Sequence, residues 1–172
     1  SGEIGVPAGF GGTLVLDRFG HAGHSYGAYT ATAIGGGDFL FAPEFRDPRI
    51  VAIAPISPQG AGQFGAFDNS AQDNTWANIT IPALNILGEA EKDSNAIGTI
   101  VEEDWRLTPF ERYPATGDKF QVILPGLDHD DVVGFPTAEI GTYLGENTRL
   151  FFDVYLKGQV SGVCGIAQAP AF

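Results

Sequence analysis

Short apolar runs separated by glycine- and proline-rich stretches dominate the hydrophobic pattern of the chain. The run 50–56 is continuous rather than alternating, which is typical of a strand that is covered on both faces of a parallel sheet. Residues 83–87 and 120–124 predict two further strands. A run that leads from Leu14 into residues 19–23 predicts another short, buried strand ahead of these three.

Two segments carry the signals of a helix. Residues 26–34 are rich in alanine and lack proline, and the glycines at 35–37 would stop the helix. Residues 148–157 place apolar side chains on one side at helical spacing. Asn147 is the predicted N-cap of this second helix, and Gly158 is the predicted stop.

Long connections separate the predicted strands. Glycine, proline, asparagine and aspartate dominate residues 57–78, and the stretch containing residues 104–114 is irregular. Strands joined by long crossovers predict an α/β architecture, a mostly parallel sheet flanked by helices, with residues 1–172 in a single domain. Active sites of such sheets lie at the carboxyl ends of the strands, so the residues that follow each run are the candidates for chemistry.

The first predicted strand runs directly into Gly23-His24-Ser25-Tyr26-Gly27, which matches the pattern G-x-S-x-G. This pattern suits a tight strand-to-helix turn that lifts a serine hydroxyl above the sheet, and its glycines avoid clashes that Cβ atoms would cause there. Ser25 is therefore the predicted nucleophile. The backbone N–H of Tyr26, at the start of the following helix, is the predicted oxyanion donor.

A serine hydroxyl needs a base to take its proton, and the chain contains three histidines. His129 follows the last predicted strand and is the one that completes the chain order serine, acid, histidine. His21 lies within the first strand and His24 adjoins the serine, so both are expected to have structural roles. His129 is the predicted general base.

The acid that orients the histidine should follow the third predicted strand, where three carboxylates occur. Asp93 is the preferred candidate because a small hydroxyl residue follows it, which suits the turn at this place. Glu91, three residues after Gly88, remains open as the alternative acid. Glu89 is expected to be a solvated neighbour.

Charge and composition exclude several classes of function. The 21 acidic and 9 basic residues give a net charge of −12, which argues against nucleic acid as a partner. No apolar run is long enough for a transmembrane segment. Cys164, the only cysteine, is either a small apolar residue or a half-cystine whose partner lies on another chain, and no cysteine metal cluster can form.

Further motifs make the chain resemble a known group of proteins. They are residues 23–30 (GHSYGAYT), 47–50 (DPRI), 57–60 (SPQG), 109–112 (PFER), 117–120 (GDKF) and 151–158 (FFDVYLKG). In this order they resemble bacterial serine α/β-hydrolases of the dienelactone-hydrolase-like and platelet-activating-factor-acetylhydrolase-like type. The resemblance implies ester hydrolysis through an acyl-enzyme without metal or organic cofactor, with Ser25 and His129 in their predicted roles. The family's acid usually occupies the position of Glu91 and is usually an aspartate.

The resemblance also implies a larger fold than these residues can build. Only 22 residues precede Gly23, whereas the family has several strands before the serine, one of which leads to the second oxyanion donor. The chain also contains no methionine. We therefore expect the C-terminal part of an α/β-hydrolase fold, with the N-terminal strands supplied by a separate chain or segment of a nicked enzyme.

The sequence thus predicts a serine carboxylic-ester hydrolase that acts on lipid-like, small or polymeric esters. A peptidase or acyltransferase would use the same residues, and a non-catalytic binding or structural module with this fold is the alternative from another class. Self-cleavage that exposes Ser1 as a nucleophile is a weaker reading. A secreted or periplasmic location is expected, with the sequon at Asn78 as slight support.

Aromatic residues in the long connections could line the ester pocket. The candidates are Phe64, Phe67, Trp76 and Trp105, and ordinary packing is the alternative for each of them.

Overall fold

The computed structural model of the chain describes residues 11–12, 15–39, 44–62, 75–93, 103–134 and 136–168. Its centre is a four-stranded, all-parallel sheet whose strands follow one another in sequence order. The strands are β1 (Phe19–His24), β2 (Ile50–Ile56), β3 (Ala83–Gly88) and β4 (Lys119–Leu124).

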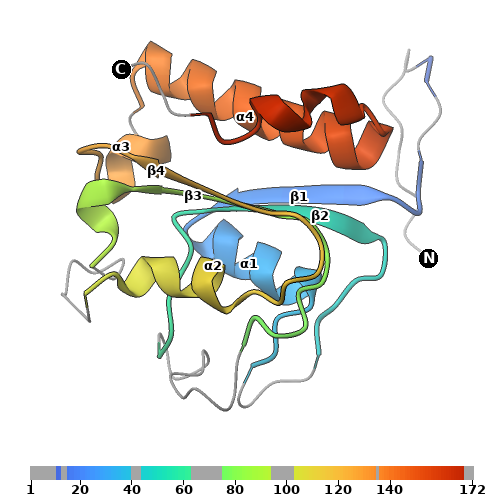
Figure 1. Cartoon of the computed structure of the whole chain (residues 1–172), viewed down its shortest axis with the longest axis horizontal. Coiled ribbons are helices and arrows are strands. Elements are labelled where there is room, and N and C mark those ends of the chain that lie inside the picture. Colours follow the sequence, from blue (N-terminus) through green and yellow to red (C-terminus); the bar gives the residue numbers. More distant parts are fainter. Residues whose placement is uncertain are drawn as a thin grey trace.

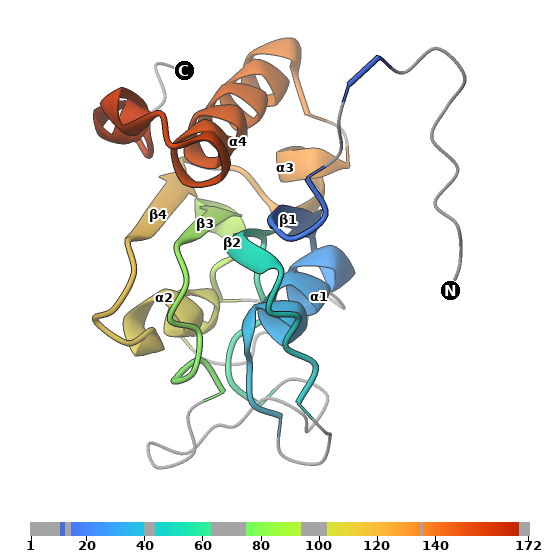
Figure 2. The same cartoon turned by 90° about the vertical axis from the view of Figure 1, so that its right-hand side faces the viewer.

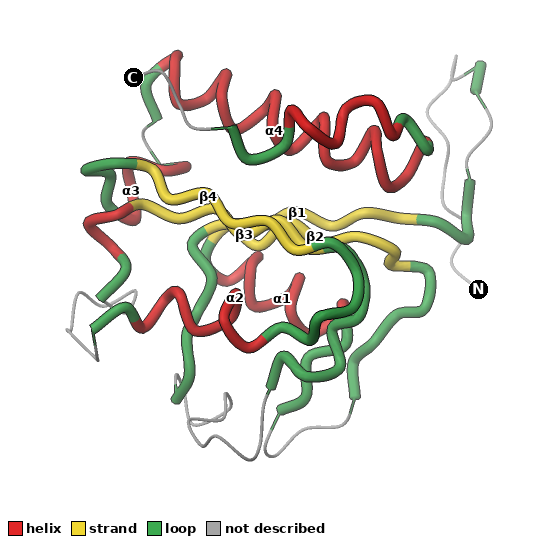
Figure 3. Tube along the Cα trace, viewed as in Figure 1, coloured by secondary structure: helices red, strands yellow, loops and turns green. Residues whose placement is uncertain are grey.

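Helices cover both faces of this sheet. The α-helices are α1 (Tyr26–Gly35), α2 (Thr108–Arg112), α3 (His129–Val133) and α4 (Ala138–Lys157). Short 3₁₀ turns are η2 (Glu89–Glu91), η3 (Trp105–Leu107) and η4 (Val160–Gly165). Figures 1 and 3 show α4 on one face of the sheet and α1 and α2 on the other, which makes three layers.

Each face of the sheet has its own apolar cluster. Between the sheet and α4, Ala52, Leu84 and Leu124 are fully buried with Phe151. On the opposite face, Ile53 and Ala83 pack with Ala31 of α1 and with Trp76. Because both faces of β2 and β3 are covered, these strands carry apolar residues in succession instead of alternating with polar ones.

The structure confirms the predicted α/β architecture. The run 50–56 forms β2, and residues 83–87 and 120–124 lie within β3 and β4. The first strand begins later than the pattern suggested, at Phe19, and Leu14 lies outside the described residues. The first helix ends as expected, because Gly36 adopts the left-handed conformation, with φ 113°, that glycine accommodates without strain.

The predicted start of the last helix is wrong. α4 begins at Ala138 with Thr137 as its N-cap, whereas Asn147, the expected cap, is buried inside the helix. Gly141 and Gly145 fall in the part that the pattern missed, where glycine weakens the helical signal. The predicted stop is correct, since Gly158 caps the helix in the left-handed conformation.

Short helical segments also occupy places that were expected to be irregular. The stretch containing residues 104–114 includes η3 and α2, and α3 begins directly at His129. α2 and α3 have five residues each, too few for a hydrophobic period to identify them. No helix among the described residues has the length and apolarity that crossing a membrane requires.

Candidate active site

Ser25 stands in a strained turn between β1 and α1. Its backbone has φ 56° and ψ −111°, and it connects the last residue of the strand to the first residue of the helix. Its N–H donates to the carbonyl of Ile56 at 3.0 Å, which ties the turn to β2. Its own carbonyl accepts from Ala28 and Tyr29 at 2.9 and 3.1 Å, which starts the helix. Residues other than glycine rarely adopt a positive φ, and such strained backbone conformations are often found at functional sites.

The two glycines that flank Ser25 differ in whether a side chain would fit at their positions. A Cβ atom on Gly23 would lie 2.5 Å from the backbone of Gly27, so this position excludes any side chain. A Cβ on Gly27 would meet nothing within 4 Å among the described residues. The close approach of the two backbones therefore requires Gly23, and the expectation that both glycines avoid clashes holds for Gly23 alone.

The first residue of α3 is His129, and the loop before it is fixed at both ends. Asp128 caps α3 by accepting from the N–H groups of Asp130 and Asp131, both at 3.0 Å. The carbonyl of Leu127 accepts from Ala90 N–H of η2 at 2.9 Å. These bonds hold His129 at the start of α3, which lies at the carboxyl end of the sheet, on the left in Figure 1.

The structure brings Ser25, His129 and Glu91 together. His129 Nε2 lies 3.0 Å from Ser25 Oγ, and His129 Nδ1 lies 2.6 Å from Glu91 Oε2. Since a carboxylate only accepts, Nδ1 carries the proton, which leaves Nε2 to accept from the serine hydroxyl. Each of the three residues follows a different strand, β1, β3 or β4, so the parallel sheet is what assembles them.

Glu91, the second of the two candidate acids, is the carboxylate in contact with His129. Its side chain has no exposed surface. Its Oε1 accepts from the hydroxyl of Ser57 at 2.6 Å and from the N–H of Gly88 at 2.8 Å. The bond from Gly88 spans three residues, which is the reach of a short 3₁₀ turn and explains why the acid occurs at this spacing.

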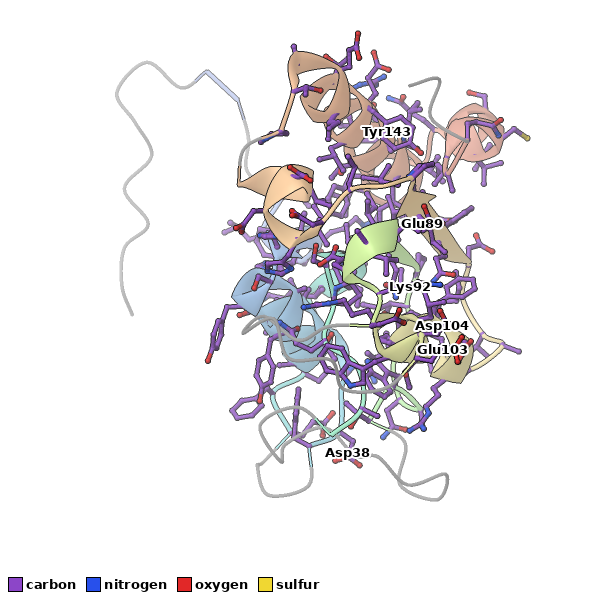
Figure 4. The ribbon with its side chains drawn as sticks, turned by 90° about the vertical axis from the view of Figure 1, so that its left-hand side faces the viewer. Asp38, Glu89, Lys92, Glu103, Asp104 and Tyr143 are labelled. Atoms are coloured by element: carbon purple, nitrogen blue, oxygen red, sulfur yellow. The ribbon has the colours of Figure 1, made fainter. Side chains whose placement is uncertain are left out.

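The preference for Asp93 as the acid is corrected by this geometry. Asp93 Oδ1 accepts from the backbone N–H of Asp104 at 2.5 Å, so the carboxylate joins two chain segments. Lys92 and Asp104 form an ion pair of 2.9 Å beside this link. Figure 4 shows both residues on the side of the molecule where the strands end, below Glu89. The carboxylate of Glu89 accepts from the N–H of Gly126. Glu89 is exposed, as expected of a solvated neighbour.

Burial and hydrogen bonding act in opposite directions on the acid. Burial alone would raise the pKa of Glu91, but the hydrogen bonds from His129, Ser57 and Gly88 outweigh it. The charge of Arg106 adds to them, and the pKa of Glu91 lies below its ordinary value. The carboxylate therefore remains charged beside His129 at neutral pH.

His24 packs against the candidate base. Its Nε2 donates to the carbonyl of His129 at 3.1 Å, and the two rings lie 4.6 Å apart, centroid to centroid. Burial, followed by the charge of His129, lowers the pKa of His24, so its ring is neutral at pH 7. His24 contacts the backbone of His129, as expected of a residue with a structural role.

Three residues that the sequence did not single out as site residues support this arrangement. Ser57 and Arg106 contact Glu91, and the side-chain amide of Gln59 donates to the carbonyl of Ser25 at 2.7 Å. Ser57 and Gln59 belong to the motif at 57–60 that directly follows β2. Their position directly after a strand was a signal that could have identified them. Arg106 had no such signal, because it lies in η3, within a connection that the sequence predicted to be irregular.

The other candidate positions have simpler explanations. Trp76 and Trp105 are buried in the packed interior, and Phe64 and Phe67 lie outside the described residues. Tyr26 is the first residue of α1, where helices present backbone N–H groups, and its side chain is exposed.

Two further expectations concern the chemistry of cysteine and metals. Cys164 is exposed in η4, and a disulfide to another chain stays a prediction. No group of three or more His, Cys, Asp or Glu side chains that could hold a metal ion occurs among the described residues.

In comparisons with known proteins, no family model matches the chain and no curated relative matches its sequence. A serine hydroxyl is hydrogen-bonded to an imidazole that a buried carboxylate orients, and this arrangement can turn the hydroxyl into a nucleophile.

Proposed function

We propose that the protein is a serine hydrolase that cleaves carboxylic esters through an acyl-enzyme. The observation that carries the proposal is the connected pair of contacts from Ser25 Oγ to His129 Nε2 and from His129 Nδ1 to Glu91 Oε2. The strained backbone of Ser25 at the end of β1 supports it, because this conformation raises the hydroxyl at the edge of the sheet where the other two residues meet.

In the proposed reaction His129 takes the proton of Ser25 as Oγ attacks the ester carbonyl carbon. Glu91 stabilises the imidazolium that forms, and the backbone N–H of Tyr26 binds the oxyanion of the tetrahedral intermediate. The bond to the alkoxy group then breaks, and His129 gives its proton to the departing alcohol. Water, deprotonated by His129, attacks the acyl-enzyme in the same way and releases the acid and free Ser25.

We further infer that a separate chain or segment of the enzyme completes the site beside β1. Within the described part of the sheet β1 pairs with β2 alone, so one side of the strand that leads to Ser25 is an edge. Ala22 of this strand is exposed, whereas Ala52 and Ala54 of β2 are fully buried. A segment that pairs with β1 would cover this edge and supply the second oxyanion donor.

A groove between α3, α4 and the end of β2 supports the same partner. It has a volume of about 560 Å³ and is lined mainly by apolar residues of α3 and α4, among them Val132, Leu144 and Phe152. An open apolar surface of this kind marks a place where further structure packs. Intact-mass analysis of the active enzyme isolated without denaturation should find a second polypeptide with the 18.2 kDa chain, and a fully active 18.2 kDa species alone would exclude it.

A fluorophosphonate probe, which reacts with activated serines, tests the proposed function. We expect labelling at Ser25 and hydrolysis of short p-nitrophenyl esters, and loss of both in Ser25→Ala. If the wild-type protein is folded and remains unlabelled, the non-catalytic module is the better account. Amide cleavage or transfer of the acyl group to an alcohol, each compared with ester hydrolysis, would identify a peptidase or an acyltransferase.

The substrate and location remain proposals from the sequence. Lipid-like, small and polymeric esters all fit a Ser-His-acid site, because the triad acts on the carbonyl group and not on the rest of the ester. A secreted or periplasmic location likewise rests on the sequence alone.

A further inference from the structure

The segment that follows β2 lies between the nucleophile and the acid. Ser57 is fully buried and has a positive φ of 50°, which a serine adopts at a cost in free energy. Its N–H donates to the carbonyl of Ile86 in β3 at 2.7 Å. A strained, buried polar residue that directly follows a central strand needs contacts that hold it there.

On one side this segment holds the acid. The hydroxyl of Ser57 donates to Glu91 Oε1 at 2.6 Å, where both side chains are buried. Hydrogen bonds to a charged, desolvated carboxylate are among the stronger ones in proteins. Because Oε1 is bonded to Ser57 and Gly88, Oε2 is turned toward His129.

On the other side it holds the nucleophile. The amide of Gln59 donates to the carbonyl of Ser25 at 2.7 Å, and Gln59 is itself 3% exposed. The same carbonyl begins α1 by accepting from Ala28 and Tyr29. Gln59 therefore contacts the peptide group that sets the strained turn, and not the reacting hydroxyl.

Arg106 connects the segment to the acid. Its Nη1 donates to the carbonyls of Ser57 and Pro58, each at 3.0 Å, and its Nε lies 3.6 Å from Glu91 Oε2. The side chain has no exposed surface. Burying a guanidinium group costs free energy unless the group is paired with an opposite charge and hydrogen-bonded. Arg106 is paired with Glu91 and bonded to two carbonyl groups.

The positioning unit consists of Ser57, Gln59 and Arg106. We propose that this unit fixes the carboxylate of Glu91 relative to the backbone of Ser25, so that the imidazole between them is held at both nitrogens. The proposal rests on the proposed hydrolase function. In this proposal none of the three side chains contacts the reacting atoms. They are therefore positioning residues and not catalytic residues.

The ionisation of Glu91 provides a readout that a purely structural role would not move. Glu91 faces His129 of α3, Arg106 of η3 and His24 of β1, together with the hydroxyl of Ser57 and the N–H of Gly88. Removing the Ser57 hydroxyl takes away a hydrogen bond that lowers the pKa of Glu91. The carboxylate would then be protonated at higher pH, so the pH titration of the Glu91 side-chain carboxyl carbon, followed by NMR, would move upward.

Four variants of the purified protein test the positioning unit with p-nitrophenyl butyrate. Ser57→Ala should lower kcat on the order of 10–100-fold, leave KM within about threefold, and move the titration of Glu91 to higher pH. Gln59→Leu should lower kcat without moving that titration, because Gln59 does not contact Glu91. Arg106→Lys keeps the charge but cannot reproduce the planar fork, so kcat should fall with a smaller change in the titration of Glu91. Tyr113→Phe, which removes a hydroxyl bonded to Asn85 at 3.0 Å, is the matched control.

The possible outcomes separate the positioning unit from the proposed function. If wild type is active and Ser57→Ala matches Tyr113→Phe in kcat and in the titration of Glu91, the positioning unit is wrong while the hydrolase proposal stands. If wild type shows no activity that depends on Ser25, the hydrolase proposal fails. The low-field NMR resonance of the His129 Nδ1 proton then still tests the geometry. That resonance should be present in wild type and Tyr113→Phe and weakened or shifted in Ser57→Ala, and an unchanged resonance would overturn the inference.

Discussion

On the acid side of the site, Glu91 has no exposed side-chain surface, and Ser57, Gly88 and His129 of the same chain bond its carboxylate. On the nucleophile side, Ser25 follows β1, which pairs with a neighbour on one side only within the described part of the chain. Figure 2 shows β1 at the side of the sheet away from β4. Ala22 of β1 and Tyr26 of α1 are exposed. The carboxylate is enclosed by its own chain, whereas the turn that carries the hydroxyl lies at an edge of the sheet.

This difference shows that the parts of one candidate site can depend on different amounts of structure. Glu91 and His129 follow the adjacent strands β3 and β4, and the loop before His129 is bonded to η2, so local contacts fix their distance. The position of Ser25 depends on β1, and a strand at the edge of a sheet is held by half as many neighbours as a central one. We therefore expect variants on the acid side to act through chemistry and variants near β1 to act through assembly.

The largest effect is expected from the choice of acid. Glu91→Gln keeps the size of the side chain but removes the charge that stabilises the imidazolium, and kcat should fall about 10³- to 10⁴-fold. Asp93→Asn is the matched control, since Asp93 bonds the backbone of Asp104 and not His129. Its kcat should stay within about threefold of wild type. Steady-state kinetics of both proteins decide the assignment, and the opposite ranking would restore Asp93 as the acid.

The next effect compares the two glycines of the nucleophile turn. In Gly23→Ala the new Cβ would lie 2.5 Å from the backbone of Gly27, so the turn must open at a cost of about 3 kcal/mol or more. Gly27→Ala meets nothing within 4 Å among the described residues and lies in a helix, where alanine is favoured by about 1 kcal/mol. Urea unfolding of the two variants measures the difference. Equal stabilities would mean that the backbones do not approach each other in this way.

A third comparison tests whether the edge at β1 is covered in the active protein. A covered edge would leave the carboxylate of Ala22→Asp buried without a partner, which should cost about 2 kcal/mol or more and reduce activity. Ile123→Asp, at an exposed position in the opposite edge strand β4, is the matched control and should change stability little. Thermal unfolding of the complete enzyme checks both, and an Ala22→Asp variant as stable as the control would leave no covering segment to propose.

Much of the fold could be predicted because its signals are local. The apolar run 50–56 and the glycines after residues 26–34 identify a buried strand and the end of a helix without any tertiary information. The start of α4 could not be found in this way. Gly141 and Gly145 weaken the helical pattern there, and the apolar surface against which the helix packs is known only once the sheet has formed.

In the candidate site, too, the residues with local sequence signals could be predicted and the others could not. Ser25 and His129 could be located because each directly follows a predicted strand and chain order selects between the histidines. The acid could not be chosen, since Glu91 and Asp93 lie two residues apart and only the 3₁₀ turn after Gly88 decides which one faces inward. The role of Arg106 could not be predicted at all, because it depends on carbonyl groups almost 50 residues away in sequence.

The smallest effect concerns the cap that holds His129. The carboxylate of Asp128 accepts hydrogen bonds from the backbone N–H groups of Asp131 and Asp130 in α3, and these bonds keep the pKa of Asp128 below its ordinary value. A carboxyl group whose pKa is lower in the folded state adds stability above its unfolded pKa, and that stability is lost as the pH falls through the folded value. Asp128→Asn, which can still cap but does not titrate, should therefore show a shallower loss of Tm below about pH 4 than wild type. Thermal unfolding from pH 6 down to pH 3 measures this difference. If Tm falls in parallel for the two proteins, the titration of Asp128 does not contribute to the loss of stability at low pH. The acid side would then depend on Glu91 and its buried partners.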